Sequence, residues 1–429
     1  MDYQQAIDFI HSLERFGSKP GLERIRALSQ RLGNPQDRLK FIHIAGTNGK
    51  GSTAAFIASV ASAAGFKTGL YTSPFIERFN ERIKLNGEDI SDEELVKYVA
   101  RVKWVIDEMI AEGLEHPTEF EVITALAFLY YYEKNCDLLV LEVGMGGRFD
   151  ATNIISAALV SVITKIEMDH MTILGDTLAK IAYEKAGIIP ENGRVVTYPQ
   201  EQSALETIEA VCNNKKATLY RVDPAELTDV TLEKRKLSFI HPRLGVIETP
   251  IVGVHQVYNA AVALKTLEVL VEMGYRIPPE KVRLGFQNAS WPGRFELLQT
   301  HPDFYIDGGH NPDGIRSFVE TFKAIYPGRK ATIIFGVMHD KEYETMVAEL
   351  SAIASRFIAV TPVTPRAFPA EKLAKVMAKY CQFVEISDTI KGAVEKSMQL
   401  SSADDIIASL GSLYYIGQVR SLFRTEFCN

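Results

Sequence analysis

Long apolar runs are missing from this sequence. No stretch approaches the roughly 20 consecutive apolar residues that a helix needs to cross a bilayer. The first residues, Met1 to Gln5, include no basic segment followed by an apolar core, so we expect no signal peptide. These two absences predict a cytoplasmic protein with no membrane partner.

Cysteines and basic runs are also scarce. The chain contains four cysteines, without metal-ligand spacing: Cys136, Cys212, Cys381 and Cys428. This usage predicts free thiols in a reducing compartment. The 54 Asp and Glu outnumber the 47 Lys and Arg, and the net charge of −7 argues against nucleic acid as a partner. The remaining composition, 46% hydrophobic and 24% charged over 429 residues, is typical of a globular protein with two or three domains.

The glycine-rich turn Gly46–Ser52 is the stretch around which the chain is organised. A short apolar strand precedes it, and small apolar residues at helical spacing follow it. A strand, such a turn and a helix form a phosphate cradle, because backbone N–H groups approach the anion and the helix N-terminus adds partial positive charge. We predict that Lys50 reaches the terminal phosphates and that Ser52 or Thr53 faces Mg²⁺ or a phosphate. Since Gly51 separates Lys50 from Ser52, the alternative is an ordinary turn with a surface lysine.

Polar residues follow three other predicted strands of the same sheet. Ser73, Glu142 and His170 each come at the end of an apolar run. Ligands collect at the carboxyl edge of open α/β sheets, and a carboxylate there is well placed to hold Mg²⁺. The alternatives are an ion pair between Glu142 and Arg148 and a structural role for His170.

A turn-rich segment, Trp291–Glu296, marks the expected domain boundary, because it cannot continue the preceding helix. We expect an ATP-binding P-loop domain over residues 1–296, with a β-rich part at about 190–252. Residues 297–429 then alternate strands and helices, which predicts a smaller α/β domain with a parallel sheet. Its first strand ends at Asp307 and its last at Leu410, and both ends should lie on one edge of that sheet.

Taken together, the motifs resemble the folylpolyglutamate synthase/dihydrofolate synthase branch of the Mur ligase family. In the family's order they are residues 46–52, 71–74 with Arg82, 142–148, 150–153, 184–187, 291–294 and 307–312. The resemblance implies an α/β, Mur-ligase-like fold. An N-terminal P-loop ATPase domain with a parallel sheet would be joined to a smaller C-terminal Rossmann-like domain.

The resemblance also implies a reaction, the ATP-dependent addition of L-glutamate to a folate. The folate carboxylate attacks the γ-phosphate to give an acyl phosphate and ADP, and the glutamate amine then displaces phosphate. ATP and Mg²⁺ are the implied cofactors, and a need for a monovalent cation such as K⁺ stays open. Lys50, Mg²⁺ and the loop amides would stabilise charge on the transferring phosphoryl group.

Residue roles follow from the same resemblance. The ATP-binding positions are Asn48, Gly49, Lys50, Gly51, Ser52, Asn259, Arg294 and Asp307. The Mg²⁺ ligands are Ser73, Glu142 and His170. The folate or pteroate positions are Thr118, Phe120, Glu121, Phe149, Asp150 and Ala151. The glutamate positions are His310 and Ser412, and the expected catalytic residues are Lys50, Lys185 and His310.

Lys185 has two interpretations. Its sequence context, a helix over residues 179–187, indicates an ordinary helix lysine. The resemblance instead matches it to a position that is carbamylated in the family. An ammonium would repel Mg²⁺, whereas a carbamate would add a negative oxygen ligand.

Several alternatives stay open. The enzyme either extends folates only, or is bifunctional and also joins glutamate to dihydropteroate. A cell-wall precursor ligase fits less well, because no separate N-terminal domain for a uridine nucleotide precursor is visible. Outside the family, the alternatives are a P-loop kinase or NTPase without ligase chemistry and a non-catalytic nucleotide-binding module. No coiled coil or apolar stripe argues for assembly, so we expect a monomer with small-molecule partners.

Overall fold

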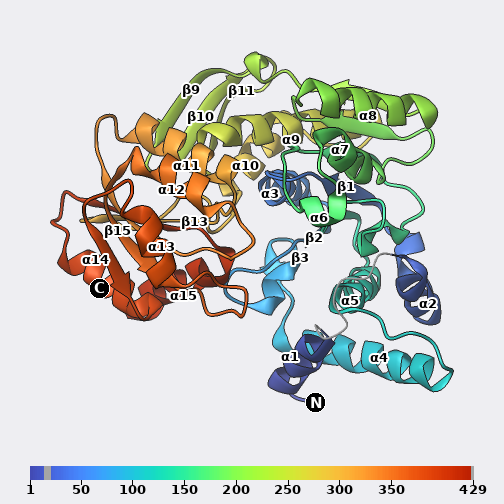
Figure 1. The fold of residues 1–429 in the computed structure, drawn as a ribbon. Coiled ribbons are helices and arrows are strands. Elements are labelled where there is room, and N and C mark those ends of the chain that lie inside the picture. The colour runs from blue at the N-terminus through green and yellow to red at the C-terminus, as the bar shows by residue number, and fades with distance from the viewer. Residues whose placement is uncertain (14–20, 427–429) are drawn as a thin grey trace. The chain divides into compact units, whose positions relative to one another are not determined.

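A computed structural model describes residues 1–13 and 21–426, and its contacts divide the chain into two compact units (Figure 1). Unit 1 comprises Met1–Glu226 and Tyr258–Ala289, and unit 2 comprises Leu227–Val257 and Ser290–Asn429. Both units are α/β with mainly parallel sheets, which confirms the expected fold class. No helix among the described residues is long and apolar enough to cross a membrane. Cys136, Cys212 and Cys381 are free thiols, and Cys428 lies outside the described residues.

An eight-stranded sheet forms the centre of unit 1, in the order β4-β3-β2-β5-β1-β6-β7-β8. Its strands are β1 (Phe41–Ala45), β2 (Thr68–Tyr71), β3 (Ile83–Leu85), β4 (Glu88–Asp89), β5 (Leu138–Glu142), β6 (Val160–Ile163), β7 (Arg194–Thr197) and β8 (Thr218–Arg221). The strands from β2 to β8 in that order are parallel, and the hairpin β3-β4 is antiparallel at one edge. Because β1, β5 and β6 are buried on both faces, they appear in the sequence as continuous apolar runs.

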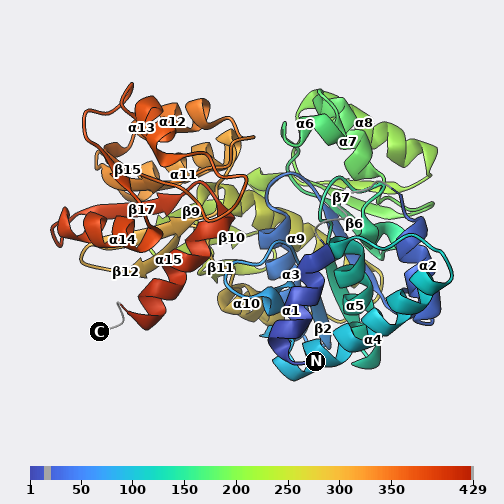
Figure 2. The ribbon, with the colours of Figure 1, turned by 60° about the horizontal axis from the view of Figure 1, so that its bottom comes forward.

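Helices cover both faces of this sheet. They are α1 (Tyr3–Ser12), α2 (Glu23–Arg31), α3 (Lys50–Ala63), α4 (Asp92–Ala111), α5 (Glu119–Glu133), α6 (Met171–Leu174), α7 (Leu178–Ala186), α8 (Gln202–Asn214), α9 (Val254–Glu272) and α10 (Pro279–Asn288). Short 3-10 helices span Pro35–Arg38, Phe79–Arg82 and Ala151–Ile154. Helix α5 is buried nearly all round and shares a core with α1, α2 and α4 (Figure 2). Helix α3 packs on β1, β2 and β5.

A six-stranded sheet forms the centre of unit 2, in the order β12-β13-β17-β14-β15-β16. Its strands are β12 (Glu296–Gln299), β13 (Asp303–Asp307), β14 (Ala331–Phe335), β15 (Ala354–Val360), β16 (Val384–Ser387) and β17 (Ile406–Leu410). Its helices are α11 (Pro312–Ile325), α12 (Tyr343–Ser351), α13 (Ala370–Met377), α14 (Ile390–Gln399) and α15 (Leu413–Thr425). All strands but β12 run parallel, and Asp307 pairs in register with Leu410. The expected common edge for these two strand ends is therefore confirmed.

Three antiparallel strands of unit 2 come from a segment that we expected in the first domain. They are β9 (Thr228–Glu233), β10 (Lys236–His241) and β11 (Gly245–Thr249). Lys234, in the turn between β9 and β10, donates to Asp303 Oδ2 at 2.6 Å, and Leu232 packs against the core of unit 2. These contacts join residues distant in the sequence, so the contact-based units differ from the expected ranges 1–296 and 297–429.

Helix α8 lies within the stretch that we expected to be β-rich. Its buried residues, Ala204, Ile208 and Cys212, recur every four positions, which is the spacing of one helix face. The helix packs against α7. The β-rich description therefore applies to β9–β11, but not to residues 202–214.

Helices α3 and α10 approach each other closely at Gly285. A Cβ atom at Gly285 would lie 2.4 Å from the Cα of Val60. Beside this contact, Ser59 Oγ donates to the Gly285 carbonyl at 2.7 Å, and the rings of Phe56 and Phe286 stack at 4.7 Å. Glycine is thus required here by packing between two helix backbones.

We expect Gly285→Ala to lower the free energy of unfolding by about 1–3 kcal/mol, the usual cost of overpacking. The loss should occur although alanine forms helices better than glycine by roughly 1 kcal/mol. Urea unfolding measures it, with Gln287→Ala on the exposed side of the same helix as the control, expected to stay within about 0.5 kcal/mol. A Gly285→Ala protein as stable as the wild type would contradict the close packing.

Candidate active site

The glycine-rich loop connects β1 to α3, as predicted. The backbone N–H groups of Thr47 and Asn48 donate to the Lys165 carbonyl at 2.8 and 3.2 Å, which ties the loop to the segment after β6. Gly49 caps α3 in a left-handed conformation with φ 87°, and a Cβ there would lie 2.3 Å from Asn259 Oδ1. The structure therefore brings Asn259 to the loop, as the predicted ATP site requires. Gly51 and Ser52 form the first turn of α3.

Lys50, Glu142 and Ser73 meet at the carboxyl ends of neighbouring strands. Lys50 Nζ donates to the carbonyls of Gly46 and Thr47, both at 3.1 Å, and lies 4.0 Å from Glu142 Oε1. The other oxygen of Glu142 accepts from the backbone N–H of Ser73 at 3.3 Å. Two of the three predicted metal ligands thus contact each other, and one of them, Glu142, lies beside the predicted phosphate-binding lysine.

Arg148 has a partner other than Glu142. Its guanidinium pairs with Glu184, with Nη2 2.7 Å from Oε1, so the alternative ion pair with Glu142 is wrong. The same guanidinium lies over the rings of Phe149 and Tyr183, 4.5 and 5.1 Å from their centroids. Phe149 is 48% exposed, so its ring is held by Arg148 and remains accessible to a ligand.

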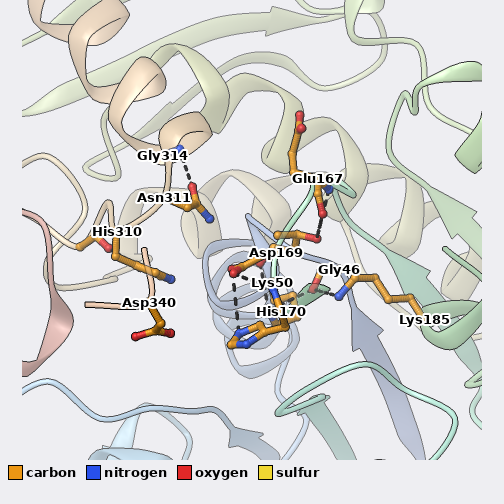
Figure 3. A network of polar contacts seen from close by, with 12 residues as sticks. Gly46, Lys50, Glu167, Asp169, His170, Lys185, His310, Asn311, Gly314 and Asp340 are labelled. Carbon is orange, nitrogen blue, oxygen red and sulfur yellow. Dashed lines mark hydrogen bonds and ion pairs between the residues drawn. The ribbon is translucent and has the colours of Figure 1, made fainter. Parts of the chain in front are cut away.

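His170 begins α6 in a left-handed conformation, with φ 49°. Its backbone N–H donates to Asp169 Oδ1 at 2.9 Å, and its Nε2 lies 3.9 Å from Asp169 Oδ2 (Figure 3). Over residues 1–13 and 21–426, no group of three or more His, Cys, Asp or Glu is arranged to hold a metal ion. The predicted ligands Ser73, Glu142 and His170 include only two residues of these four types. Their role as a magnesium site stays a prediction.

Lys185 is buried, with 4% of its surface exposed, and its Nζ donates to the Gly46 carbonyl at 2.8 Å (Figure 3). The interpretation as an ordinary helix lysine is therefore wrong. The helical periodicity did not reveal that this face of α7 meets the glycine-rich loop. Burial lowers the pKa of Lys185 to about 7, and the positive charge of Lys50 acts in the same direction. Asp169 and Asp150 oppose this shift. A large fraction of the amine is thus neutral near pH 7.

Asp150 organises the loop after β5. Its Oδ1 accepts from the Thr152 backbone N–H at 3.0 Å and from the Thr152 hydroxyl at 2.6 Å, and its Oδ2 accepts from the Met145 N–H at 2.9 Å. Burial raises the pKa of Asp150, and these hydrogen bonds oppose the shift. Ala151, next in the chain, is buried in the 3-10 helix that follows.

Thr118 and Glu121 form a capping box at the start of α5. The Thr118 N–H donates to Glu121 Oε2 at 2.7 Å, and the same oxygen accepts from Arg24 Nε at 3.1 Å. Phe120 covers Gly144, where a Cβ would lie 2.5 Å from its ring. These contacts explain Thr118 and Glu121 as structural residues, and their role in folate binding stays a prediction.

Asp307 and Arg294 lie together in unit 2. The Asp307 carboxylate accepts from the N–H groups of Phe295 at 2.8 Å and Gly309 at 2.7 Å. A Cβ at Gly308 would lie 2.0 Å from Arg294 Nη1, so glycine is required for this guanidinium to approach. Burial raises the pKa of Asp307, and the charge of Arg294 opposes the shift.

The two predicted glutamate positions follow β13 and β17. His310 Nδ1 lies 2.8 Å from the Gly308 carbonyl, which assigns a proton to Nδ1. Asn311 caps α11 by accepting from the Gly314 N–H at 2.8 Å (Figure 3). Ser412 is buried and caps α15 by accepting from the Tyr414 N–H at 3.2 Å. Glutamate binding by His310 and Ser412 stays a prediction.

The sequence-based prediction omitted three residues that contact the candidate site. Tyr183 and Thr152 touch Arg148 and Asp150, and His43 contacts Thr152, with its Nε2 2.9 Å from the hydroxyl. His43 carried a usable signal, because it is a polar residue inside the apolar strand Phe-Ile-His-Ile-Ala. Thr152 lies two positions from Asp150, within the motif of residues 150–153. Tyr183 carried no comparable signal, since its contact with Arg148 joins segments that are separate in the sequence.

Family models match most of the chain. The model of the Mur ligase middle domain matches residues 44–267, and that of the Mur ligase glutamate ligase domain matches residues 293–413. The chain is 38% identical over 427 residues to a dihydrofolate synthase/folylpolyglutamate synthase of Bacillus subtilis, covering 97% of this chain and 98% of the relative. It is 36% identical over 434 residues to a folylpolyglutamate synthase of Lacticaseibacillus casei, covering 98% of both.

Solved structures agree with these matches. A Mycobacterium tuberculosis folylpolyglutamate synthase complexed with ADP aligns with a TM-score of 0.90 at 31% identity, covering 98% of this chain and 99% of that one. An FPGS–AMPPCP–folate complex aligns with a TM-score of 0.86 at 34% identity, with the same coverage.

We expect Gly49→Ala to weaken ADP binding by about tenfold or more, equal to about 1.4 kcal/mol, because the new Cβ displaces Asn259 from the loop. Calorimetric titration with ADP measures it. Gly65→Ala is the matched control, since Gly65 also has a positive φ, 94°, but a Cβ there meets no described heavy atom within 4 Å. Both variants should lose about 1–2 kcal/mol of stability through the left-handed backbone. Equal ADP binding by the two variants would contradict the contact.

We expect the wild-type protein to gain stability relative to Lys185→Met between pH 7 and pH 9 in CO₂-free buffer. The pKa of Lys185 is about 7 in the folded state and about 10.4 in the unfolded state. In this window the unfolded chain binds more protons, so the free energy of unfolding rises with pH, by up to about 1.4 kcal/mol per pH unit. Denaturant unfolding at several pH values measures it, with Lys180→Met, at an exposed position of α7, as the control. Parallel profiles for wild type and Lys185→Met would contradict a neutral buried amine.

Proposed function

The chain belongs to the Mur ligase family, and on this premise we propose that it is a folylpolyglutamate synthase, which ligates L-glutamate to the carboxylate of tetrahydrofolate (poly)glutamates with ATP. The observation that carries the proposal is the buried Lys185 amine, 2.8 Å from the Gly46 carbonyl of the phosphate loop. A P-loop kinase or NTPase gives such an amine no role. The relatives named as folylpolyglutamate synthases support the choice of folate and glutamate as substrates.

In the proposed reaction, an oxygen of the folate carboxylate attacks the γ-phosphorus of ATP, and ADP leaves. The glutamate nitrogen then attacks the acyl carbon, loses a proton, and inorganic phosphate leaves with the former carboxylate oxygen. Lys50 and the amides of the loop, with Asn48, Gly49, Gly51 and Ser52, hold the phosphates. Asn259, Arg294 and Asp307 complete the proposed ATP contacts.

Mg²⁺ fits the donor set at the strand ends. The carboxylate of Glu142 and the hydroxyl of Ser73 are oxygen donors, which Mg²⁺ prefers, and Glu142 contacts both Ser73 and Lys50. We assign Ser73, Glu142 and His170 to this ion, which when bound would withdraw charge from the phosphates. Mg²⁺ takes six ligands, so three from these residues would leave positions for further oxygen ligands.

Carbamylation of Lys185 would supply one such oxygen. The neutral amine attacks CO₂, a C–N bond forms, and one proton leaves, which converts a potential cation into an anion. The reaction requires an uncharged amine, and the pKa of about 7 provides one at neutral pH. Lys185 therefore combines the position and the protonation state that the proposed modification needs.

The remaining substrate positions follow the family resemblance. We propose that folate contacts Thr118, Phe120, Glu121, Phe149, Asp150 and Ala151, and that L-glutamate contacts His310 and Ser412. The exposed ring of Phe149 and the closely packed Phe120 support an aromatic subsite in unit 1. We also propose that the protein acts as a cytoplasmic monomer with these small molecules as its partners.

A second candidate function is the bifunctional one, in which dihydropteroate is also an acceptor. The Bacillus subtilis relative carries both activities in its name, and the Lacticaseibacillus casei relative carries folylpolyglutamate synthase alone. The two relatives are almost equally similar to this chain, so the acceptor range has to be measured.

Labelled L-glutamate, Mg-ATP and either a tetrahydrofolate monoglutamate or dihydropteroate provide that measurement. We expect label to enter the tetrahydrofolate, and Lys185→Met to lower the rate by about 10- to 100-fold, as for loss of a group that orders a metal site. Lys180→Met, on the same helix, should keep the wild-type rate.

The acceptor pattern separates the candidates. Label in both acceptors establishes the bifunctional enzyme, and label in tetrahydrofolate alone establishes polyglutamate extension only. ATP hydrolysis that is independent of acceptor and glutamate, with no label in either acceptor, would overturn the ligase assignment in favour of an NTPase.

A further inference from the structure

His43 is the polar side chain of the apolar strand β1, and it is fully buried, with 0% of its surface exposed. It pairs in register with Leu141 of β5 and Ser161 of β6, at the centre of the sheet of unit 1. Burial lowers the pKa of His43 to about 3, so its imidazole is neutral. A neutral imidazole has one N–H donor and one bare nitrogen acceptor.

The hydrogen bonds around Thr152 assign the tautomer. The single hydroxyl proton of Thr152 goes to Asp150 Oδ1, 2.6 Å away. The 2.9 Å contact between His43 Nε2 and Thr152 Oγ1 therefore needs its proton from the imidazole. Nε2 of His43 carries the proton, and Nδ1 is the bare nitrogen.

Nδ1 of His43 is buried and has no hydrogen-bond partner within the described part of the chain. An unpaired buried acceptor costs free energy, and the neighbouring positions of the strand, Ile42 and Ile44, avoid this cost with apolar side chains. The hydrogen bond to Thr152 is what a histidine provides and an isoleucine cannot. The contact with Thr152, and through it with the hydrogen-bond partner of Thr152, therefore distinguishes His43 from its neighbours in the strand.

That partner is the buried carboxylate of Asp150. It receives the hydroxyl and the N–H of Thr152 on one oxygen and the N–H of Met145 on the other. The Thr152 hydroxyl donates a hydrogen bond to the carboxylate only while the hydroxyl proton points at Asp150. An N–H donated to Thr152 Oγ1 by His43 favours this orientation, because it occupies a lone pair of the hydroxyl oxygen.

We propose that His43 is a positioning residue for the acceptor-binding carboxylate of Asp150, acting through the Thr152 hydroxyl. The proposal rests on the proposed function, in which Asp150 belongs to the folate pocket. It extends that function to a residue that contacts Thr152 and reaches Asp150 only through it. His43 thus orders the pocket from inside the sheet, without touching the folate.

A double-mutant cycle of His43→Leu and Thr152→Val tests the relay, with the Kd and KM of a tetrahydrofolate monoglutamate and the KM of ATP as readouts. Each single variant should weaken folate binding by about 3- to 10-fold, the range for one net hydrogen bond. The double variant should bind folate no more weakly than Thr152→Val, because the relay is already broken there. The KM of ATP should change by less than about twofold, well below the change for folate.

Two further variants separate positioning from general stability. His43→Gln, which can present an amide N–H near the place of Nε2–H, should restore folate binding to within about twofold of the wild type. Ser161→Ala removes a buried hydroxyl at the strand position that pairs with His43. This hydroxyl donates to the Ile188 carbonyl at 3.1 Å, so its loss should lower stability without changing the KM of folate. If His43→Leu does not fold, the KM of folate for Thr152→Val and for His43→Gln decides the question, together with ¹⁵N NMR of the wild-type imidazole.

A proton on Nδ1 in the NMR spectrum, additive effects of the two substitutions on folate binding, or equal changes in the KM of folate and ATP would overturn the relay. A proton on Nε2 with non-additive effects would support it. A wild-type protein that incorporates no glutamate would overturn the proposed function and this role together. An active wild-type enzyme with additive variants would overturn the role of His43 alone.

Discussion

The carbonyl oxygen of Gly46 receives the amines of both Lys50 and Lys185, and the candidate site depends on this shared acceptor. Lys50 belongs to α3 and Lys185 to α7, so one backbone atom fixes two helices to the glycine-rich loop. Two ammonium groups at one carbonyl repel each other, and in a buried place the repulsion is little screened. Burial lowers the pKa of the Lys185 amine, and this repulsion by Lys50 lowers it further, so Lys185 loses its proton more readily than an exposed lysine does.

Most other polar side chains of the site are occupied by structural partners. Thr118 and Ser412 cap helices, Glu121 closes a capping box and an ion pair with Arg24, and Asp150 binds backbone and side-chain donors of its own loop. Such contacts hold side chains in one geometry before a ligand arrives, which reduces the cost of ordering them on binding. These structural contacts therefore preorganise the side chains that lie nearest the proposed chemistry.

Local sequence patterns were sufficient to predict the strand and the glycine-rich loop before α3 and the strand-end positions of Ser73 and Glu142, but not β12, which precedes the strand expected to be the first of its sheet. Continuous apolar runs, glycines and caps are signals that a short window contains. The assignment of β9–β11 to unit 2, the burial of Lys185 and the pairing of Arg148 with Glu184 were not predictable in this way. Each depends on contacts between segments distant in the chain, and helix periodicity does not say which neighbour a face will meet.

The chain order of the two units bears on how the protein is made. Because Leu227–Val257 belongs to unit 2 and Tyr258–Ala289 to unit 1, neither unit is complete when its first segment leaves the ribosome. The hairpin of β9 and β10 emerges before Asp303, the partner of Lys234, has been synthesised. Unit 1 likewise waits for α10, which closes on α3 at Gly285. Chains emerge from the N-terminus at about 5–20 residues per second, so both units pass through a seconds-long stage with uncovered apolar surface that chaperones can recognise.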